Sequence, residues 1–144
     1  FRGWARGQTM IRKRMPDKAK ARSMIEAAEL EINFIRRLEP TRESGATIIR
    51  GIYENFRMLG DALLLINGKE AIGQDHHTQM INELFKLKVN TSRPIQVLNN
   101  LKAIRNNINY RGYIPTIQDV EDVLSIADAC FKPILEAVRK ELGD

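Results

Sequence analysis

The chain has 144 residues, of which 43% are hydrophobic and 28% are charged, a composition typical of one globular domain. Its longest apolar run, Ala62 to Ile66, is too short to cross a bilayer. The single cysteine, Cys130, excludes an intrachain disulfide and a zinc cage built from cysteines, and we expect a protein of the reducing cytoplasm.

The net charge of +5 is concentrated near the N-terminus. Residues 1–22 contain eight basic side chains and one acidic side chain, whereas the rest of the chain has 15 basic and 17 acidic residues. We therefore divide the chain into a basic N-terminal arm, residues 1–16, and a helical domain, residues 17–144. Such an arm can bind nucleic acid through the phosphates, and it can equally be a solvated tail.

Apolar residues recur every three or four positions along most of the domain, which predicts helices. The first helix is predicted over residues 17–38 and the second over residues 42–66. A third, shorter helix follows Asp75, whose carboxylate we expect to cap its first turn.

The second half of the chain predicts two more helices. Pro94 suits the first turn of a fourth helix, where its missing N–H has no consequence. Thr116 and Asp119 have the spacing of a capping box for a fifth helix over residues 117–142. That helix contains Pro133, which removes one backbone hydrogen bond and should kink it. Because no segment shows the alternation typical of a strand, we expect an all-α antiparallel bundle of about five helices.

His76 and His77 are the two histidines of the chain. Adjacent residues point about 100° apart on a helix, so this pair is poorly arranged to share one ion. The chain also lacks the Glu-x-x-His pairs of di-iron bundles. We therefore expect neither a metal site nor a cofactor. The histidines either belong to an ordinary helix start or face a cleft as a proton carrier or phosphate partner.

The segment IRNNINYRGY, residues 104–113, ends the fourth predicted helix with residues that are poor helix formers. On a helical projection Arg105 lies about 40° from Leu101, the centre of the apolar stripe. A charge in that position needs partners or a cleft, unless its stem packs while the guanidinium reaches water. Arg105 and Tyr110 are about 140° apart on a continuous helix, so we expect the helix to end near Asn109 to bring them together.

The helix order and this segment resemble the HEPN family (higher eukaryotes and prokaryotes nucleotide-binding), in particular its archaeal and bacterial single-domain members. The resemblance covers about residues 17–142 and rests on IYENFRMLGDALLLINGKEAIGQDHHTQMINEL and LKAIRNNINYRGYIPTIQDVEDVLSIADACFKPIL. The family motif is an arginine, four to six residues and a histidine, with asparagine commonly after the arginine. Arg105 and Asn106 match this motif, whereas Tyr110 stands where many members have histidine.

The resemblance implies a HEPN-like homodimer that binds RNA or nucleotides, with a nucleotidyltransferase or a toxin–antitoxin component as a partner. In ribonuclease members the arginine and histidine lie near the dimer interface and cleave RNA without metal. Arg105 can supply the cation that stabilises a phosphorane. Tyrosine, with an ordinary pKa of about 10 against about 6.5 for histidine, is a poor general base, so Tyr110 favours a binding module over an enzyme.

Two other functions stay open at the level of sequence. One is a metal-independent endoribonuclease that uses Arg105 and Asn106, and the other is a structural helical dimer without a ligand. The residues that we expect at a ligand site are Arg105, Asn106, Asn109, Tyr110, His76 and His77, of which Arg105 and Tyr110 are the catalytic candidates.

Overall fold

A computed structural model describes residues 10–73 and 76–143, and within these ranges it is mainly helical with one small sheet. The helices are α1 (Lys18–Ile35), α2 (Gly45–Ile66), α3 (His76–Leu84), α4 (Leu98–Arg111) and α5 (Ile117–Leu142), and the strands are β1 (Met10–Lys13) and β2 (Lys69–Ile72). A short 3-10 turn, η1 (Ile95–Val97), precedes α4. The prediction of a bundle of about five helices is therefore confirmed for the described residues.

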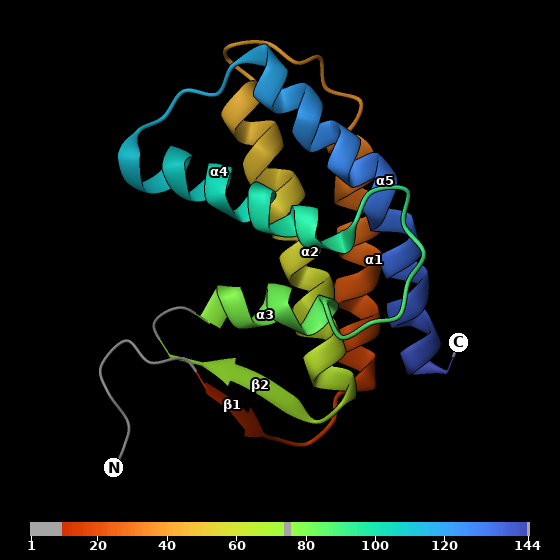
Figure 1. The fold of residues 1–144 in the computed structure, drawn as a ribbon. Helices are drawn as coiled ribbons and strands as arrows, with labels where there is room; N and C mark the ends of the chain where they lie inside the picture. The colour runs from red at the N-terminus through yellow and green to blue at the C-terminus, as the bar shows by residue number, and fades with distance from the viewer. Residues whose placement is uncertain (1–9, 74–75, 144) are drawn as a thin grey trace.

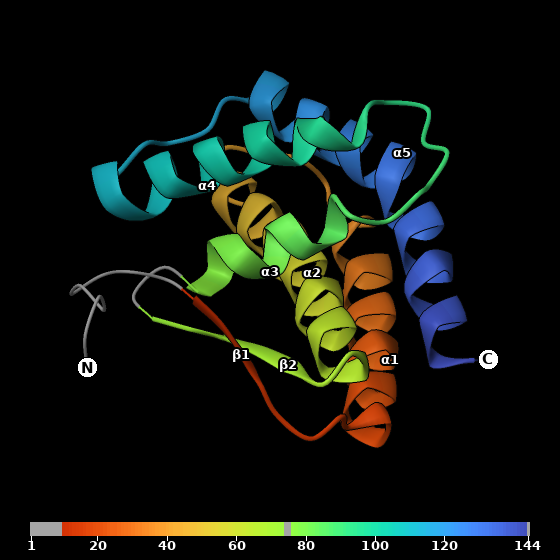
Figure 2. The same ribbon diagram turned by 60° about the horizontal axis from the view of Figure 1, so that its bottom comes forward.

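Helix α2 is the centre of the molecule. Helices α1, α2 and α5 run alongside one another, and α3 and α4 lie across α2 (Figures 1 and 2). As a result α2 contacts each of the four other helices. This position explains why most of its 22 residues are buried, whereas α4 and α5 each keep a solvent-exposed side.

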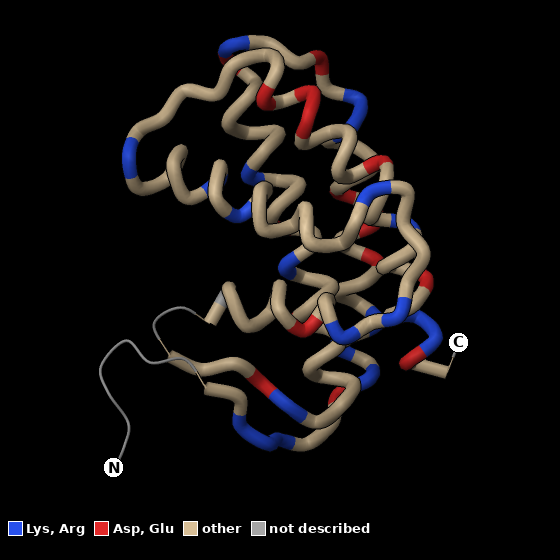
Figure 3. Tube along the Cα trace, viewed as in Figure 1, with Lys and Arg blue, Asp and Glu red and all other residues tan. Residues whose placement is uncertain are grey.

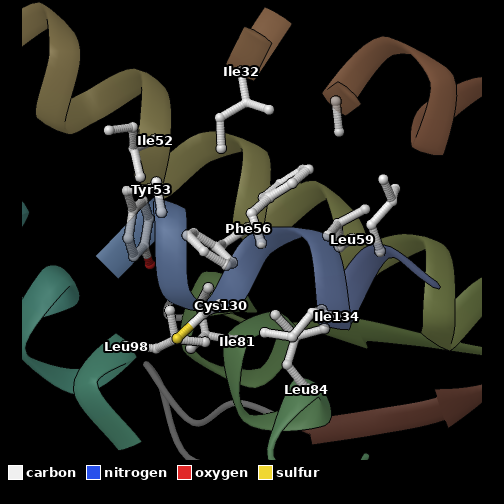
Figure 4. Close-up of a cluster of buried hydrophobic side chains, with 14 of the residues drawn as sticks. Ile32, Ile52, Tyr53, Phe56, Leu59, Ile81, Leu84, Leu98, Cys130 and Ile134 are labelled. Carbon is white, nitrogen blue, oxygen red and sulfur yellow. The ribbon is translucent and has the colours of Figure 1, made fainter. Parts of the chain in front are cut away.

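The main core forms where α1, α3, α4 and α5 meet the apolar side chains of α2 (Figure 4). Phe56 of α2 packs edge-to-face on Phe131 of α5, with ring centroids 5.3 Å apart. The neighbouring Cys130 is completely buried, as its place beside Phe131 suggests. Burial raises the pKa of the Cys130 thiol, so this side chain acts as a small apolar group rather than as a nucleophile.

Helix ends confirm several predictions from local sequence. Thr116 and Asp119 form the predicted capping box, in which the Asp119 N–H donates to Thr116 Oγ1 at 3.1 Å and the Thr116 N–H donates to Asp119 Oδ2 at 2.9 Å. Asp17 caps α1 by accepting a hydrogen bond from the Lys20 N–H at 2.9 Å. Helix α5 continues through Pro133 as one element. The predicted cap Asp75 lies outside the described residues.

The absence of strands is the part of the fold prediction that is wrong. Strand β1, which lies in the predicted basic arm, pairs antiparallel with β2 in the register Met10↔Ile72 to Lys13↔Lys69. The Arg14 N–H extends the pairing by donating to the Gly68 carbonyl at 2.9 Å. Strands of four residues are too short for the alternation of side chains to be recognised, and the paired residues are 56 to 62 positions apart along the chain.

Among the described helices, none combines the length and apolar character needed to span a membrane.

The close approach of α3 to α2 depends on Gly60. A Cβ atom added at this position would lie 1.8 Å from the Met80 carbonyl oxygen. Because a backbone atom cannot move without shifting α3, we predict that Gly60→Ala lowers the free energy of unfolding by at least about 2 kcal/mol, despite the higher helix propensity of alanine. Urea denaturation followed by circular dichroism measures this change.

Gly51→Ala is the matched control on the same helix. Its Cβ would lie 2.2 Å from Cδ1 of Ile35, the mobile end of a side chain that can adopt another rotamer. We expect a smaller loss of stability than for Gly60→Ala. Equal losses for the two variants would show that the backbone contact with α3 is not the limiting constraint.

Candidate functional site

Arg105 lies on α4 at the edge of the surface that packs on α2. Leu98, Leu101 and Ile108 anchor α4 in the core, and Arg105, which is half-buried, extends over the ring of Tyr53 on α2. The guanidinium carbon is 4.7 Å from the Tyr53 ring centroid, a cation–π distance. The charge predicted inside the apolar stripe is thus accommodated by an aromatic face.

A cleft of about 330 Å³ opens beside this contact. It is bounded by α1, α2 and α4, and its lining residues are Glu31, Arg50, Gly51, Tyr53, Glu54, Arg105 and Asn109. Two arginines therefore share one cleft. Arg50 is held by Asn109, whose side-chain oxygen accepts a hydrogen bond from Arg50 Nε at 2.6 Å, and Arg105 Nη1 donates to the side-chain oxygen of Asn106 at 3.0 Å.

The two carboxylates of the cleft are bound to other groups. Glu54 forms a two-pronged ion pair with Arg57, one turn further along α2, including a bond of 2.9 Å from Arg57 Nε. This ion pair is the main cause of a raised pKa at Arg57. Glu31 accepts a hydrogen bond at 3.1 Å from the side-chain amide of the fully buried Asn55. Among the described residues, neither carboxylate forms an ion pair with Arg50 or Arg105.

Within the described part of the chain, Arg50 and Arg105 have no carboxylate within 4.0 Å, unlike Arg12, Arg36, Arg57, Arg93 and Arg139. An amide oxygen satisfies only one of the five N–H donors of a guanidinium. The remaining donors can bind an anion, and the planar shape of the group suits the two oxygens of a phosphate or carboxylate.

The structure brings four of the six predicted site residues together. Arg105 is hydrogen-bonded to Asn106 and lines the same cleft as Asn109, and the Tyr110 ring centroid is 5.8 Å from the guanidinium carbon of Arg105. Tyr110 is 73% exposed, so its other surface is open to solvent.

The prediction that the fourth helix ends near Asn109 is wrong. Helix α4 continues to Arg111 and ends at Gly112, whose φ of 66° is the left-handed conformation that glycine adopts without strain. Arg105 and Tyr110 still come close on the continuous helix, with the guanidinium carbon 5.8 Å from the ring centroid. Convergence therefore does not require the backbone to unwind.

The histidines occupy another part of the molecule. His76 begins α3, and its Nδ1 is 3.3 Å from the Gly73 carbonyl oxygen. The His76 side chain is also close enough to Asp61 of α2 to lower the pKa of that carboxyl group. His76 is not among the residues that line the cleft. His77 belongs to α3, but its side chain is outside the described part of the structure. Among the described residues, no three His, Cys, Asp or Glu side chains are grouped as a metal site.

Sequence reasoning missed the contribution of α2 to the site. Arg50, Glu54, Arg57 and Asp61 recur every three or four residues along a helix that is otherwise mostly apolar. This spacing places them along one side of α2, and it is the signal that could have identified them. Tyr53 carries no such signal, because a buried tyrosine under an arginine cannot be distinguished by sequence from any other core aromatic residue.

Comparison with known proteins does not assign the chain to a family. No protein-family model matches the sequence, and no curated protein or solved structure matches it either.

Asp61 gives a prediction of pH dependence. Burial raises its pKa, and Arg57, Lys20 and His76 offset only part of this effect. The folded state therefore holds this proton more tightly than the unfolded state, and stability decreases as the pH rises from below the ordinary value of about 3.9 through the folded pKa. We predict that Asp61→Asn increases the free energy of unfolding at pH 7 and that this gain disappears near pH 3.

Urea denaturation at several pH values measures the effect. Asp128→Asn is the control, since Asp128 is an exposed residue paired with Arg36 and its removal should not stabilise the protein. A gain for Asp61→Asn that is the same at every pH would contradict the assignment to the ionised carboxylate.

Proposed function

We propose that this protein is a HEPN-like module that binds the phosphate groups of RNA or of nucleotides in the cleft between Arg50 and Arg105. The observation that supports this function is the presence of two guanidinium groups in one cleft, neither of which is paired with a carboxylate of the described residues. The match of Arg105 and Asn106 to the HEPN motif supports the same site. Helix α2, which carries Arg50 and Tyr53, is held in place by its contacts with all four other helices.

The surroundings of Arg105 favour binding of a phosphate in a defined orientation. The Tyr53 ring supports one face of the guanidinium, and Asn106 accepts one of its hydrogen bonds. An arginine fixed in this way loses less side-chain entropy on binding than a free one. The exposed ring of Tyr110, next to the guanidinium, can stack on a base that follows the bound phosphate.

The apolar surface beside the cleft supports the proposed homodimer. Three large apolar side chains within five residues are exposed, and we call them the apolar end patch: Tyr113, Ile114 and Ile117. Tyr113 and Ile114 also line a second cleft of about 380 Å³ together with Ile108 and Pro115. Exposed apolar groups at this density are typical of an interface, and a second copy over this patch would place Arg105 near a twofold axis.

The loop that carries the apolar end patch is held in place by Asp119. The Tyr113 hydroxyl donates a short hydrogen bond to Asp119, which raises the Tyr113 pKa. The same carboxylate caps α5 through Thr116. The patch is therefore preformed in the single chain, as an interface with a low ordering cost should be. The family resemblance further favours a nucleotidyltransferase or an antitoxin as a protein partner.

Substitution of Arg105 tests the binding site. We predict that Arg105→Lys, which retains the charge but loses the planar fork, weakens binding of a fluorescent single-stranded RNA by at least about 1 kcal/mol, and that Arg105→Ala weakens it further. Fluorescence anisotropy measures the affinity. Arg111→Ala removes an exposed arginine from the same helix and should have a smaller effect.

Thermal melting of the same variants separates binding from folding. Reduced binding with an unchanged melting temperature supports the site. A lower melting temperature with full binding by the folded fraction would make Arg105 a structural residue.

Incubation of labelled tRNA and mRNA with and without EDTA tests whether the protein cleaves RNA. Cleavage that persists in the presence of EDTA would support the metal-independent ribonuclease instead of the binding module.

Sedimentation tests the dimer. We predict a twofold dimer at tens of micromolar protein, and a shift toward monomer for Ile114→Asp, because a buried carboxylate in the apolar end patch would lack a partner. Leu30→Asp changes an even more exposed apolar residue on α1, outside the apolar end patch, and should leave the dimer intact. A monomeric parent protein under these conditions would contradict the proposed assembly.

A further inference from the structure

The positive charge of the chain is organised around the two-stranded sheet. Residues 10–22 carry six basic side chains against Asp17, whereas residues 23–144 have a net charge of −2. Three of these cations flank or belong to the strand pair, and β2 adds a fourth. We call these four residues, with β1 and β2, the basic ribbon: Arg12, Lys13, Arg14 and Lys69. The basic segments of β1, β2 and the start of α1 lie together at one end of the molecule (Figure 3).

The register of the strands places two cations opposite each other. Lys13 of β1 is the direct partner of Lys69 of β2. Like charges at directly opposed positions of an antiparallel pair destabilise it, because their Cβ atoms are only about 5 Å apart. Neither lysine forms an ion pair with a described carboxylate. A bound anion between the two ammonium groups would convert this repulsion into attraction.

The next pair in the register shows the opposite arrangement. Glu70 lies opposite Arg12 and forms ion pairs with both Arg12 and Arg14, the latter at 3.6 Å. One carboxylate thus links the two arginines on one face of the basic ribbon. The other face presents Lys13 and Lys69 without an internal counter-charge, because successive residues of a strand point to opposite sides.

We infer that the basic ribbon is a contact for the phosphodiester backbone of nucleic acid, with Lys13 and Lys69 as the phosphate-binding pair. Lysine ammonium groups act as point charges that tolerate many phosphate positions, which suits a contact independent of sequence. Lys18 and Lys20, on the first turn of α1, extend the positive surface. The contact is separate from the proposed cleft and does not depend on it.

The separation of the two surfaces can be estimated along α2. Arg50 lies near the start of this helix, and β2 follows its end at Ile66, so the helix places roughly 24 Å between them at 1.5 Å per residue. A nucleic acid of a few nucleotides can therefore occupy one surface alone, and a longer strand can reach both.

Lys13→Glu is the decisive substitution, because it has opposite effects on binding and stability. It turns the Lys13–Lys69 repulsion into a pair of opposite charges, so the melting temperature should stay the same or rise. Binding of a fluorescent single-stranded RNA of about 20 nucleotides, measured by anisotropy at low salt, should weaken by about fivefold or more. A residue that merely supports the fold would not show this combination.

The salt dependence identifies the type of contact. Lys13→Gln combined with Lys69→Gln should lower the slope of log affinity against log salt by about 1.4, since each phosphate contact on a single strand contributes about 0.7. The matched control is Lys88→Gln with Lys132→Gln, which removes two lysines from a separate groove beside α5 and should change neither slope nor affinity by as much.

Three results would overturn the inference. The first is RNA binding that is unchanged both in Lys13→Glu and in the double substitution of the basic ribbon. If Arg105→Ala then abolishes binding, the cleft is the RNA-binding site and the basic ribbon is not. The second is an equal loss in the Lys88/Lys132 control, which would indicate diffuse attraction. The third is binding to vesicles rich in phosphatidylserine, but not to RNA, that is lost in Lys13→Glu.

Discussion

The contact of α2 with all four other helices is the constraint on which the rest of the structure depends. A helix that is covered on most sides has few positions left for polar side chains, and it must allow each neighbour to approach. Gly60 allows the backbone of α3 to lie against α2 where any side chain would collide. Apolar residues fill the contacts with α1 and α5. The charged residues of α2, from Arg50 to Asp61, recur every three or four positions and therefore lie along one side of the helix.

On that side, two neighbouring cations are accommodated by different means. Arg57 forms an ion pair with Glu54 on the same helix, so its charge is balanced within the protein. Arg105 instead lies on the Tyr53 ring and contacts an amide oxygen. An aromatic face and an amide stabilise the charge without cancelling it. This difference, and not the number of arginines, separates a structural ion pair from a group that can bind an external anion.

The two proposed phosphate-binding surfaces also differ in the chemistry of their side chains. The cleft presents planar guanidinium groups that are held by neighbours, which favours recognition of one phosphate in one orientation. The basic ribbon presents flexible ammonium groups, which favour a sequence-independent and salt-sensitive attraction to a polyanion. The net charge of +5 hides this division, since most of it resides in the ribbon and the first turns of α1, while the cleft contains as many carboxylates as arginines.

The helices, the capping box at Thr116, the burial of Cys130 and the unusual position of Arg105 follow from the sequence itself, because each depends on residues within a few positions of one another. Local periodicity decides which face of a helix is apolar, and a charge on that face is visible without coordinates. The strand pair, the ring of Tyr53 under Arg105, and Arg50 and Glu31 in the cleft were decided only by the tertiary structure. Each of these joins segments that are tens of residues apart, and their contact depends on how α2 places its neighbours in space. The sequence could therefore indicate that Arg105 needs a partner, but only the packing of α4 across α2 could decide that the partner is an aromatic ring, which leaves the charge available to a ligand.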